Sequence, residues 1–363
     1  MNKNFNNKFW AGKKVFVTGH TGFKGSWLCI FLKLLGAKVT GYALQPKTKP
    51  SLFKLGKIDR ILEKSIYADV RNFKKLFAEI KKSKANIIFH LAAQPLVRHS
   101  YIEPKETFET NFLGTLNILE SVRKIKTIKS TVIITTDKVY DIKKNKVFKE
   151  TDLLGGSDPY SGSKVSCEFL FSSYISSFFQ NNTRQKLATV RAGNVIGGGD
   201  YSKDRLIPDI LFYAKKENKI ILRNPNAVRP WQHVLEPLNG YLILAEKLYR
   251  NDTKIKNIKQ NWNFGPNLPN CKSASYIANY IANYFAKHMN LQIKIVKTKS
   301  KIYKPETDFL RLDNFKSKNF LKWYPQWTLE ESLKKILEWH NLTKFENPKV
   351  VCENQIKNFL KKN

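Results

Sequence analysis

The chain has little cysteine, little acidic charge and no long apolar run. Its 363 residues include 29 acidic side chains against 64 lysines and arginines, and the four cysteines Cys29, Cys167, Cys271 and Cys352 form no CxxC pair and have no histidine cluster beside them. We therefore expect reduced thiols, with neither a disulfide framework nor a metal site. No apolar run reaches the roughly 18 to 20 residues of a membrane helix, and residues 1–9 are polar with no signal segment. These absences predict a cytoplasmic protein with no membrane partner.

The excess of basic residues gives a formal net charge of +35, which raises the question of an anionic partner. The lysines are dispersed through every segment, as at residues 74–75, 81–82, 215–216 and 334–335, and no basic array is interleaved with aromatics. Such a distribution is typical of a solvated, lysine-rich surface. We expect no nucleic-acid partner, while attraction of a small anionic substrate fits the charge.

The apolar content supports a packed globule. Hydrophobic residues make up 42% and aromatics 13% of the chain, in short runs along its length. This composition argues against disorder. The length fits one large α/β unit or two joined domains.

Short β-branched segments alternate with helical patterns through the first 195 residues. Strands are predicted at 13–18, 37–43, 85–91, 131–135 and 187–191, and helices at 24–35, 107–124 and 163–179. Parallel strands need crossover connections, so the alternation predicts an α/β fold with a Rossmann-type, doubly wound parallel sheet. We expect residues 8–195 to form a dinucleotide-binding domain that also carries catalytic residues.

From residue 197 onward the pattern changes to longer loops punctuated by proline and glycine. Strands are predicted at 219–222 and 293–298, and helices at 237–249 and 328–339, the latter as the final helix. We expect residues 196–342 to form a smaller, mainly substrate-binding domain over the carboxyl edge of the sheet, where ligands bind in such folds. Residues 343–363 are rich in lysine and asparagine and are expected to be a basic tail.

A glycine-rich turn, GHTGFKG at residues 19–25, joins the first strand to the first helix. Gly19, Gly22 and Gly25 permit a tight turn and close approach of a pyrophosphate to the helix N-terminus. The GxxGxxG spacing is a weak signal alone, and its place between a strand and a helix strengthens it. The turn therefore predicts a dinucleotide cofactor.

The end of the second strand lacks the acidic residue that would bind the adenosine ribose. Residues 39–44 read VTGYAL, and the nearby Lys47 and Lys49 make no clear 2′-phosphate site. NAD is expected, and NADP stays open. Asp69 is either an adenine-side contact or a turn-forming aspartate.

Tyr160 and Lys164 form a YxxxK pattern on a predicted helix, which places both side chains on one face. An ammonium beside the phenol favours the phenolate, so we expect Lys164 to lower the pKa of Tyr160 and make it a proton acceptor for a substrate hydroxyl. The pair follows the glycine turn and a TTDK strand end at residues 135–138, and the combination predicts hydride-transfer chemistry.

With these motifs in hand, the chain resembles the extended short-chain dehydrogenase/reductases that act on nucleotide sugars. The resemblance covers roughly residues 8 to 340, and finer strings resemble the CDP-glucose branch of the 4,6-dehydratases. These strings are GHTGFKGSWL (19–28), HLAAQPLVR (90–98), TTDK (135–138), LGGSDPYSGSK (154–164), RAGNVIGGGD (191–200), DRLIPD (204–209) and RPWQHVLEPL (229–238).

The resemblance implies a catalytic role for five residues. Thr136 binds the sugar 4-hydroxyl while Tyr160, supported by Lys164, removes its proton and the C4 hydride passes to the cofactor. Asp137 then serves as the acid and Lys138 as the base that eliminate water across C5 and C6. The stored hydride returns to C6 and gives a 4-keto-6-deoxy sugar.

The same resemblance implies the binding residues. For the cofactor these are Gly19, His20, Gly22, Phe23, Lys24, Gly25, Asp69, Val70, Leu91, Ala92, Ala93, Asn111, Tyr160 and Lys164. For the substrate they are Gln94, Asn194, Asp204, Arg205, Arg229 and His233, of which Asn194 and Arg229 are placed to meet the pyrophosphate. For Asp204, Arg205 and His233 a loop-bracing role is the alternative.

Lys138 stands where related dehydratases carry glutamate. At its ordinary pKa of about 10.4 a lysine is almost entirely charged at neutral pH. Burial or cationic neighbours must therefore lower the pKa of Lys138 if it is to act as a base. The alternative is a lysine that lies at the surface or positions the substrate.

Three alternatives stay open at this point. A 4-epimerase, or a dehydratase for another nucleotide sugar, would share the cofactor turn and the YxxxK pair, and Asp137 with Lys138 speaks against the epimerase. A non-catalytic dinucleotide-binding scaffold would have lost the tyrosine, lysine or threonine, all of which are present. Only the resemblance points to CDP-D-glucose as substrate and to a homodimer formed through the helix that carries Tyr160.

Overall fold

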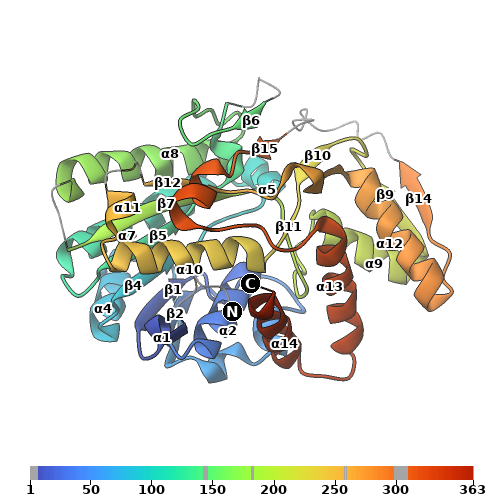
Figure 1. Ribbon diagram of the computed structural model, residues 1–363, viewed down its shortest axis with the longest axis horizontal. Helices are drawn as coiled ribbons and strands as arrows, with labels where there is room; N and C mark the ends of the chain where they lie inside the picture. Colours follow the sequence, from blue (N-terminus) through green and yellow to red (C-terminus); the bar gives the residue numbers. More distant parts are fainter. Residues whose placement is uncertain are drawn as a thin grey trace.

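The computed structural model describes residues 7–141, 146–180, 184–256, 258, 260–297 and 310–362. Within them a seven-stranded parallel sheet has the order β3-β2-β1-β4-β5-β7-β12 (Figure 1). The strands are β1 (Lys14–Thr18), β2 (Lys38–Ala43), β3 (Lys64–Tyr67), β4 (Ile87–His90), β5 (Ser130–Ile134), β7 (Lys186–Ala192) and β12 (Asn261–Phe264). The predicted Rossmann-type, doubly wound sheet is confirmed.

The strand order reverses beside β1. The chain first runs outward through β2 and β3, then returns to place β4 on the other side of β1. Doubly wound sheets bind ligands in the crevice at such a switch point, outside the carboxyl ends of the strands. The loops after β1 and β4 are therefore the part of the fold best placed to hold a ligand.

The sheet is buried on both faces, as a parallel sheet requires. In β1, Val15 and Val17 pack into one apolar cluster with α2 (Phe23–Leu34) and α10 (Leu235–Tyr249), while Phe16 packs into the cluster on the opposite face. The opposite face is covered by α4 (Phe73–Ser83), α7 (Gly114–Lys124) and α8 (Pro159–Tyr174) (Figure 1).

Shorter elements complete this part of the molecule. They are α1 (Asn7–Trp10), α3 (Leu52–Leu55), α5 (Val97–Ile102), α6 (Pro104–Phe108) and α11 (Thr253–Lys256), with the single turns η1 (Ile58–Ile61), η2 (Glu109–Leu113), η3 (Asp137–Val139), η4 (Ile175–Phe179), η5 (Leu268–Asn270) and η6 (Ser317–Leu321). Helix α6, the wide π-turn η2 and α7 follow one another directly, so the helix predicted at 107–124 is present and begins earlier.

A second cluster of elements lies beyond the carboxyl edge of the sheet, at the right of Figure 1. Helices α9 (Leu206–Glu217), α12 (Ala274–Met289) and α13 (Leu329–Leu342) pack around the parallel pair β9 (Lys219–Leu222) and β14 (Lys294–Lys297) and share one apolar core. Short pairs join the two parts: β8 (Val195–Ile196) with β11 (Gln232–His233), β10 (Val228–Pro230) with β13 (Cys271–Ser273), and β6 (Val147–Phe148) with β15 (Arg311–Leu312).

The proposed boundary at residue 195 does not separate the sheet from the rest of the chain. Strand β12 pairs with β7 as the outermost strand, and α10 covers one face of the sheet, yet both lie between residues 196 and 342. The chain thus returns to the sheet after it has begun the second cluster. The strand predicted at 293–298 corresponds to β14, and Thr298 lies outside the described residues.

Much of the expected basic tail is helical, so the helix predicted at 328–339 is not the final one. After α13 the chain forms a further helix, α14 (Pro348–Lys361), whose Val351, Ile356 and Phe359 are buried against the rest of the protein. Contacts with α2 and α13 hold it in place. The apolar positions recur at helical spacing, but the lysines and asparagines between them conceal the pattern. Asn363, the last residue of the predicted tail, lies outside the described residues.

Candidate active site

The glycine turn forms a cradle between β1 and α2. Gly19 has φ +76°, and a Cβ there would lie 2.7 Å from the backbone nitrogen of Ala92. A Cβ on Gly25 would lie 2.1 Å from the carbonyl oxygen of Gly19. Only glycine permits both approaches, and Gly22, the N-cap of α2, caps no N–H group with a side chain. The first N–H groups of α2 are thus left for an anionic group, as the predicted pyrophosphate site requires.

The loop after β4 closes the other side of the cradle. The Ala92 N–H donates to the hydroxyl of Thr18, and the Leu91 N–H donates to the Thr18 carbonyl. Ala93 follows at once, so residues 91–93 lie at the switch point of the sheet. The structure thus brings together the glycine turn and the predicted cofactor residues of this loop.

Gln94 and Asn111 hold that loop in place. The Gln94 side chain donates to Thr107 and to the Leu96 carbonyl, and its backbone N–H donates to Asn111 Oδ1 at 2.8 Å. Asn111 Nδ2 donates to Ser163 Oγ at 2.8 Å, which ties η2 to α8. Both amides are buried and engaged within the protein, so the structure gives them a bracing geometry at this site.

Asp69, Val70 and His20, all predicted cofactor residues, have different surroundings in the structure. Asp69, after β3, accepts hydrogen bonds from the backbone and guanidinium of Arg71, which hold the pKa of its carboxyl below the ordinary value. This geometry matches the turn-forming alternative for Asp69. Val70 is buried directly beneath Gly114. The His20 ring is fully buried, lies against Gly41 and bonds Ser65, and burial lowers its pKa to about 4.

Tyr160 and Lys164 lie one turn apart on α8, as predicted, and both are buried. The Lys164 ammonium donates to the carbonyl of Ile134 at 3.1 Å. Burial raises the pKa of Tyr160 to about 12, and the hydroxyl of Thr136 acts in the opposite direction. The pKa of Tyr160 thus rises instead of falling as expected, because desolvation of the phenolate outweighs the groups that lower it.

Asp137 and Lys138 lie in the turn η3, which follows β5, and Thr136 is its N-cap. The Thr136 hydroxyl donates to Asp137 Oδ1 at 3.1 Å, while Oδ2 is buried and has no hydrogen-bond partner among the described residues. Burial raises the pKa of Asp137, against the effect of the positive charge of Lys138. A buried carboxyl with a raised pKa and a free oxygen is suited to donate a proton. Lys138 is half-buried beside it.

Three further cationic side chains lie close enough to change the pKa values of Asp137 and Tyr160. The charges of Arg229 and Lys24 both act on Asp137, and that of Arg205 acts on Tyr160. Lys24 is the one lysine of the glycine turn, and burial lowers its pKa to about 8, with Arg205 acting in the same direction. Arg205 is held by an ion pair of 2.9 Å with Asp200. The fold thus gathers positive charge around one buried carboxyl.

Two of the predicted substrate residues are placed elsewhere. The ring of His233 is fully buried between Trp27 and Trp327, with centroids 5.7 and 4.7 Å away. The ring has no exposed surface, so its position in this structure is one of packing within the protein. Asp204 forms ion pairs with Arg98 and Arg223, which matches the loop-bracing alternative. Asn194 is half-buried near the site, where its carbonyl accepts from the Gln232 N–H.

A buried network beneath the site was assigned no role from the sequence. Glu168, one turn beyond Lys164 on α8, pairs with Arg191 at 2.9 Å, and both side chains are buried. The spacing 160, 164, 168 is the signal that could have found it, because it places all three residues on one helix face. Arg191 is the first residue of the string RAGNVIGGGD at residues 191–200, one of the strings on which the resemblance rests.

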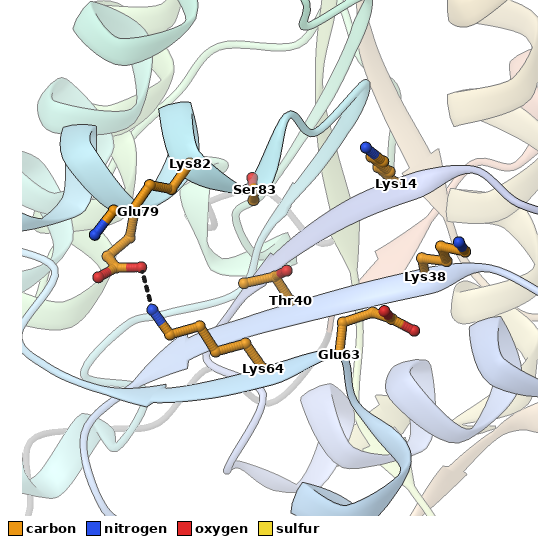
Figure 2. A pocket seen from close by; sticks show the side chains of 8 residues that line it. All are labelled: Lys14, Lys38, Thr40, Glu63, Lys64, Glu79, Lys82 and Ser83. Atoms are coloured by element: carbon orange, nitrogen blue, oxygen red, sulfur yellow. Dashed lines mark hydrogen bonds and ion pairs between the residues drawn. The ribbon is translucent and has the colours of Figure 1, made fainter.

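A surface cavity of about 270 Å³ lies at the opposite edge of the sheet (Figure 2). Lys14, Lys38 and Lys64, at the amino ends of β1, β2 and β3, line it together with Lys82 of α4, and Lys64 pairs with Glu79 at 2.8 Å. All four lysines are exposed. The cavity therefore lies on the edge remote from the glycine turn and the catalytic candidates.

Within the described ranges, no cluster of three or more histidine, cysteine or acidic residues is arranged to hold a metal ion. The four cysteines are free and buried. No helix in the same part of the chain has the length and apolarity needed to cross a membrane.

Comparison with known proteins bears directly on this site. The family model described as GDP-mannose 4,6 dehydratase matches residues 16–336. A CDP-glucose 4,6-dehydratase of Salmonella typhimurium is 44% identical over 337 residues, which cover 92% of this chain and 91% of the relative. A dTDP-D-glucose 4,6-dehydratase of Dictyostelium discoideum is 29% identical over 213 residues, 55% of this chain and 47% of the relative.

Solved structures share the fold at lower identity. A dTDP-glucose 4,6-dehydratase from Bacillus anthracis, in complex with NAD, has a TM-score of 0.75 and 23% identity, and the match covers 93% of this chain and 98% of that one. A UDP-glucose 4-epimerase from Thermotoga maritima, with UDP-glucose, has a TM-score of 0.74 and 20% identity, covering 91% and 99%. Because the family model spans most of the chain and a near-full-length relative is 44% identical to it, the chain belongs to the GDP-mannose 4,6 dehydratase family.

Proposed function

We propose that the protein is a lyase that converts CDP-D-glucose to CDP-4-dehydro-6-deoxy-D-glucose and water with bound NAD. The buried Asp137 carboxyl carries this proposal, since its raised pKa and its unbonded Oδ2 suit an acid for elimination. The 44% identity to a CDP-glucose 4,6-dehydratase supports the choice of substrate.

The cradle fits a dinucleotide. Gly19 and Gly25 permit backbone approaches that any Cβ would block, and the N-terminus of α2 offers N–H groups to a pyrophosphate. Residues 91–93 and the Lys24 ammonium complete the binding surface, and Asp69 and Val70 border its adenosine side. NAD held by these residues would supply the acceptor for the C4 hydride and the hydride that reduces C6.

The first half of the reaction needs a base at the sugar 4-hydroxyl. Thr136 binds this hydroxyl and Tyr160 removes its proton, while the Lys164 ammonium stabilises the phenolate. Burial raises the pKa of Tyr160, so nearby positive charge such as that of Arg205 favours its deprotonation. The C4 hydride leaves at the same time and a 4-ketone results.

The second half uses the turn η3. The 4-ketone acidifies the C5 proton, which Lys138 removes, while Asp137 protonates the departing 6-hydroxyl and water leaves. The hydride held by the cofactor would then add to C6 while a proton returns to C5, so the net change would be the loss of one water. Arg229, Arg205 and Asn194 lie around this turn and are the candidates to hold the nucleotide diphosphate.

A panel of CDP-, dTDP-, GDP- and UDP-hexoses tests the proposal. The 4-keto-6-deoxy product absorbs in base, and we expect it chiefly with CDP-D-glucose, at catalytic or co-purified NAD. Stoichiometric consumption of NADH or NADPH would contradict a dehydratase, and preference for another nucleotide would reassign the substrate. Recovery of a C4 epimer with its 6-hydroxyl retained would favour the epimerase, whose fold this chain shares.

We further propose that the protein is a cytoplasmic homodimer. The α8 helix exposes Phe169, and the neighbouring α6 and η2 expose Phe108 and Leu113. An apolar surface on the helices beside the site suits a second copy of the chain. Sedimentation of the native protein and of Phe169→Asp tests this: the native protein should sediment as a dimer and the variant as a monomer.

A further inference from the structure

The two halves of the proposed catalytic group come from different elements. Tyr160 and Lys164 lie on α8, whereas Thr136, Asp137 and Lys138 lie on the turn after β5. Oxidation and elimination act on the same sugar, so the helix and the turn must keep a fixed separation. A shift of about 1 Å at a catalytic group can cost about 100-fold in rate.

Glu168 joins α8 to three neighbouring strands of the sheet. Its Oε1 accepts from Thr135 Oγ1 at 2.6 Å and from Arg191 Nε at 2.9 Å. Its Oε2 accepts from Thr189 Oγ1 at 2.9 Å, Arg191 Nη2 at 3.0 Å and Asn261 Nδ2 at 2.8 Å. The donors come from the β5 end, β7 and β12, which are neighbours in the sheet (Figure 1).

Arg191 connects Glu168 to Tyr140, which follows the turn η3. Its Nη1 donates to the Tyr140 hydroxyl at 2.8 Å, and that hydroxyl donates to Asn263 Oδ1 at 2.7 Å. The Tyr140 ring stacks on Phe148 at 5.0 Å. Thr135 precedes and Tyr140 follows the segment 136–139, so both ends of the turn are bonded to the Glu168–Arg191 pair.

The buried Glu168–Arg191 ion pair fixes the relative position of the groups that it joins. Both side chains are buried, and the Arg191 charge holds the pKa of Glu168 below the ordinary value despite desolvation. A buried ion pair adds little net stability but fixes geometry when every donor and acceptor is satisfied. The two-pronged contact of an arginine fork with a carboxylate sets both distance and orientation.

We propose that Glu168 and Arg191 are positioning residues, which hold the turn bearing Asp137 and Lys138 at the distance from Tyr160 that elimination requires. The inference rests on the proposed function. The acid and the base both lie on the turn, whereas the base for oxidation lies on α8 with Glu168. Loosening the pair therefore slows elimination more than oxidation.

Tyr140→Phe and Glu168→Gln test the role, with Glu236→Gln as matched control. Tyr140→Phe removes one hydroxyl from the connection and keeps the ring, so it carries the smallest risk to folding. Glu236 is likewise buried, but its carboxylate binds the backbone N–H groups of Gln326 and Trp327. Single turnovers with CDP-D-glucose follow cofactor reduction by absorbance, and solvent deuterium at C5 and product release report elimination.

We expect the ratio of the elimination rate to the oxidation rate to fall about 10-fold in Tyr140→Phe and further in Glu168→Gln, so that reduced cofactor accumulates. The ratio does not depend on the fraction of folded protein, so Glu236→Gln should leave it unchanged even if its Tm falls. Unchanged ratios in both test variants, with a native enzyme that completes the reaction, would overturn the positioning role alone. A native enzyme that forms no 4-keto-6-deoxy product would overturn the proposed function and this role with it.

Discussion

Lysines line both edges of the central sheet, but in opposite environments. At the amino edge Lys14, Lys38 and Lys64 are exposed around the surface cavity (Figure 2). At the carboxyl edge Lys164 is buried, and the pKa values of Lys24 and Lys164 are both lowered, chiefly by burial. The same residue type serves solvation at one edge and chemistry at the other. The net charge alone therefore says little about function, because the surroundings of each ammonium decide its role.

We expect the largest difference in activity between the two edges when Tyr160→Phe is compared with Lys38→Ala. Removing the phenol should slow C4 oxidation by about 10²- to 10⁴-fold, as general-base deletions do. Because the pKa of Tyr160 is raised to about 12, native oxidation should quicken as pH rises through the neutral range. Single-turnover cofactor reduction measures both effects. Equal losses in the two variants would remove the distinction between the edges.

Asp137→Asn separates the two halves of the reaction. Oxidation at C4 should continue near the native rate, while loss of the 6-hydroxyl slows about 100-fold or more because only that step needs the proton. The raised pKa of Asp137 keeps it protonated to higher pH than an ordinary carboxyl, so native elimination should decline as pH rises through that pKa. A variant unable to reduce bound NAD would contradict the assigned role.

Lys138→Met tests the base on the same turn. We expect C4 oxidation to persist and solvent-deuterium exchange at C5 to fall by about 10²-fold, in the range of a lost general base. Lys138→Glu, which restores the residue of related dehydratases, should recover part of the exchange with an altered pH profile. Deuterium exchange at the native rate in Lys138→Met would leave this lysine as a positioning group.

Lys24→Gln probes the half-buried lysine of the glycine turn. Its pKa of about 8 means that the ammonium is charged below and neutral above that pH. Affinity for NAD should therefore weaken as pH rises through 8. Loss of one charge-assisted hydrogen bond predicts about 10-fold weaker binding at pH 7 and a flat profile in the variant. Titration calorimetry measures it, with Lys38→Gln as the control that keeps the native profile.

The smallest effect is expected at the amino edge. Lys64 pairs with Glu79, but the lysine is half-exposed. Lys64→Ala should change the free energy of unfolding by about 0.5 kcal/mol or less, because exposed pairs are screened and cost side-chain entropy. Urea unfolding measures this change, and kcat should stay native. A loss of activity in Lys64→Ala would show that the amino edge of the sheet is coupled to the catalytic site at the carboxyl edge.

By itself, the sequence determined the features that depend on local geometry. The β1–α2 turn with Gly19 and Gly25 needs residues without a Cβ, and the Tyr160–Lys164 pair follows from helical spacing. Each of these features can therefore be predicted from a few neighbouring residues. The alternation of strands and helices predicted the parallel sheet for the same reason. The direction in which the pKa of Tyr160 shifts could not be predicted from the sequence, because desolvation depends on which residues cover the ring.

The tertiary structure decided what depends on distant partners. Helix α14 is ordered because its apolar stripe meets α2, more than 300 residues away in the chain. His233 looks like a ligand contact in its motif, and only the packing of Trp27 and Trp327 shows its burial. The Glu168–Arg191 pair joins α8 to residues of β7 and β12 and to the end of β5. Burial and long-range pairing are properties of the folded surroundings, and no short stretch of sequence contains them.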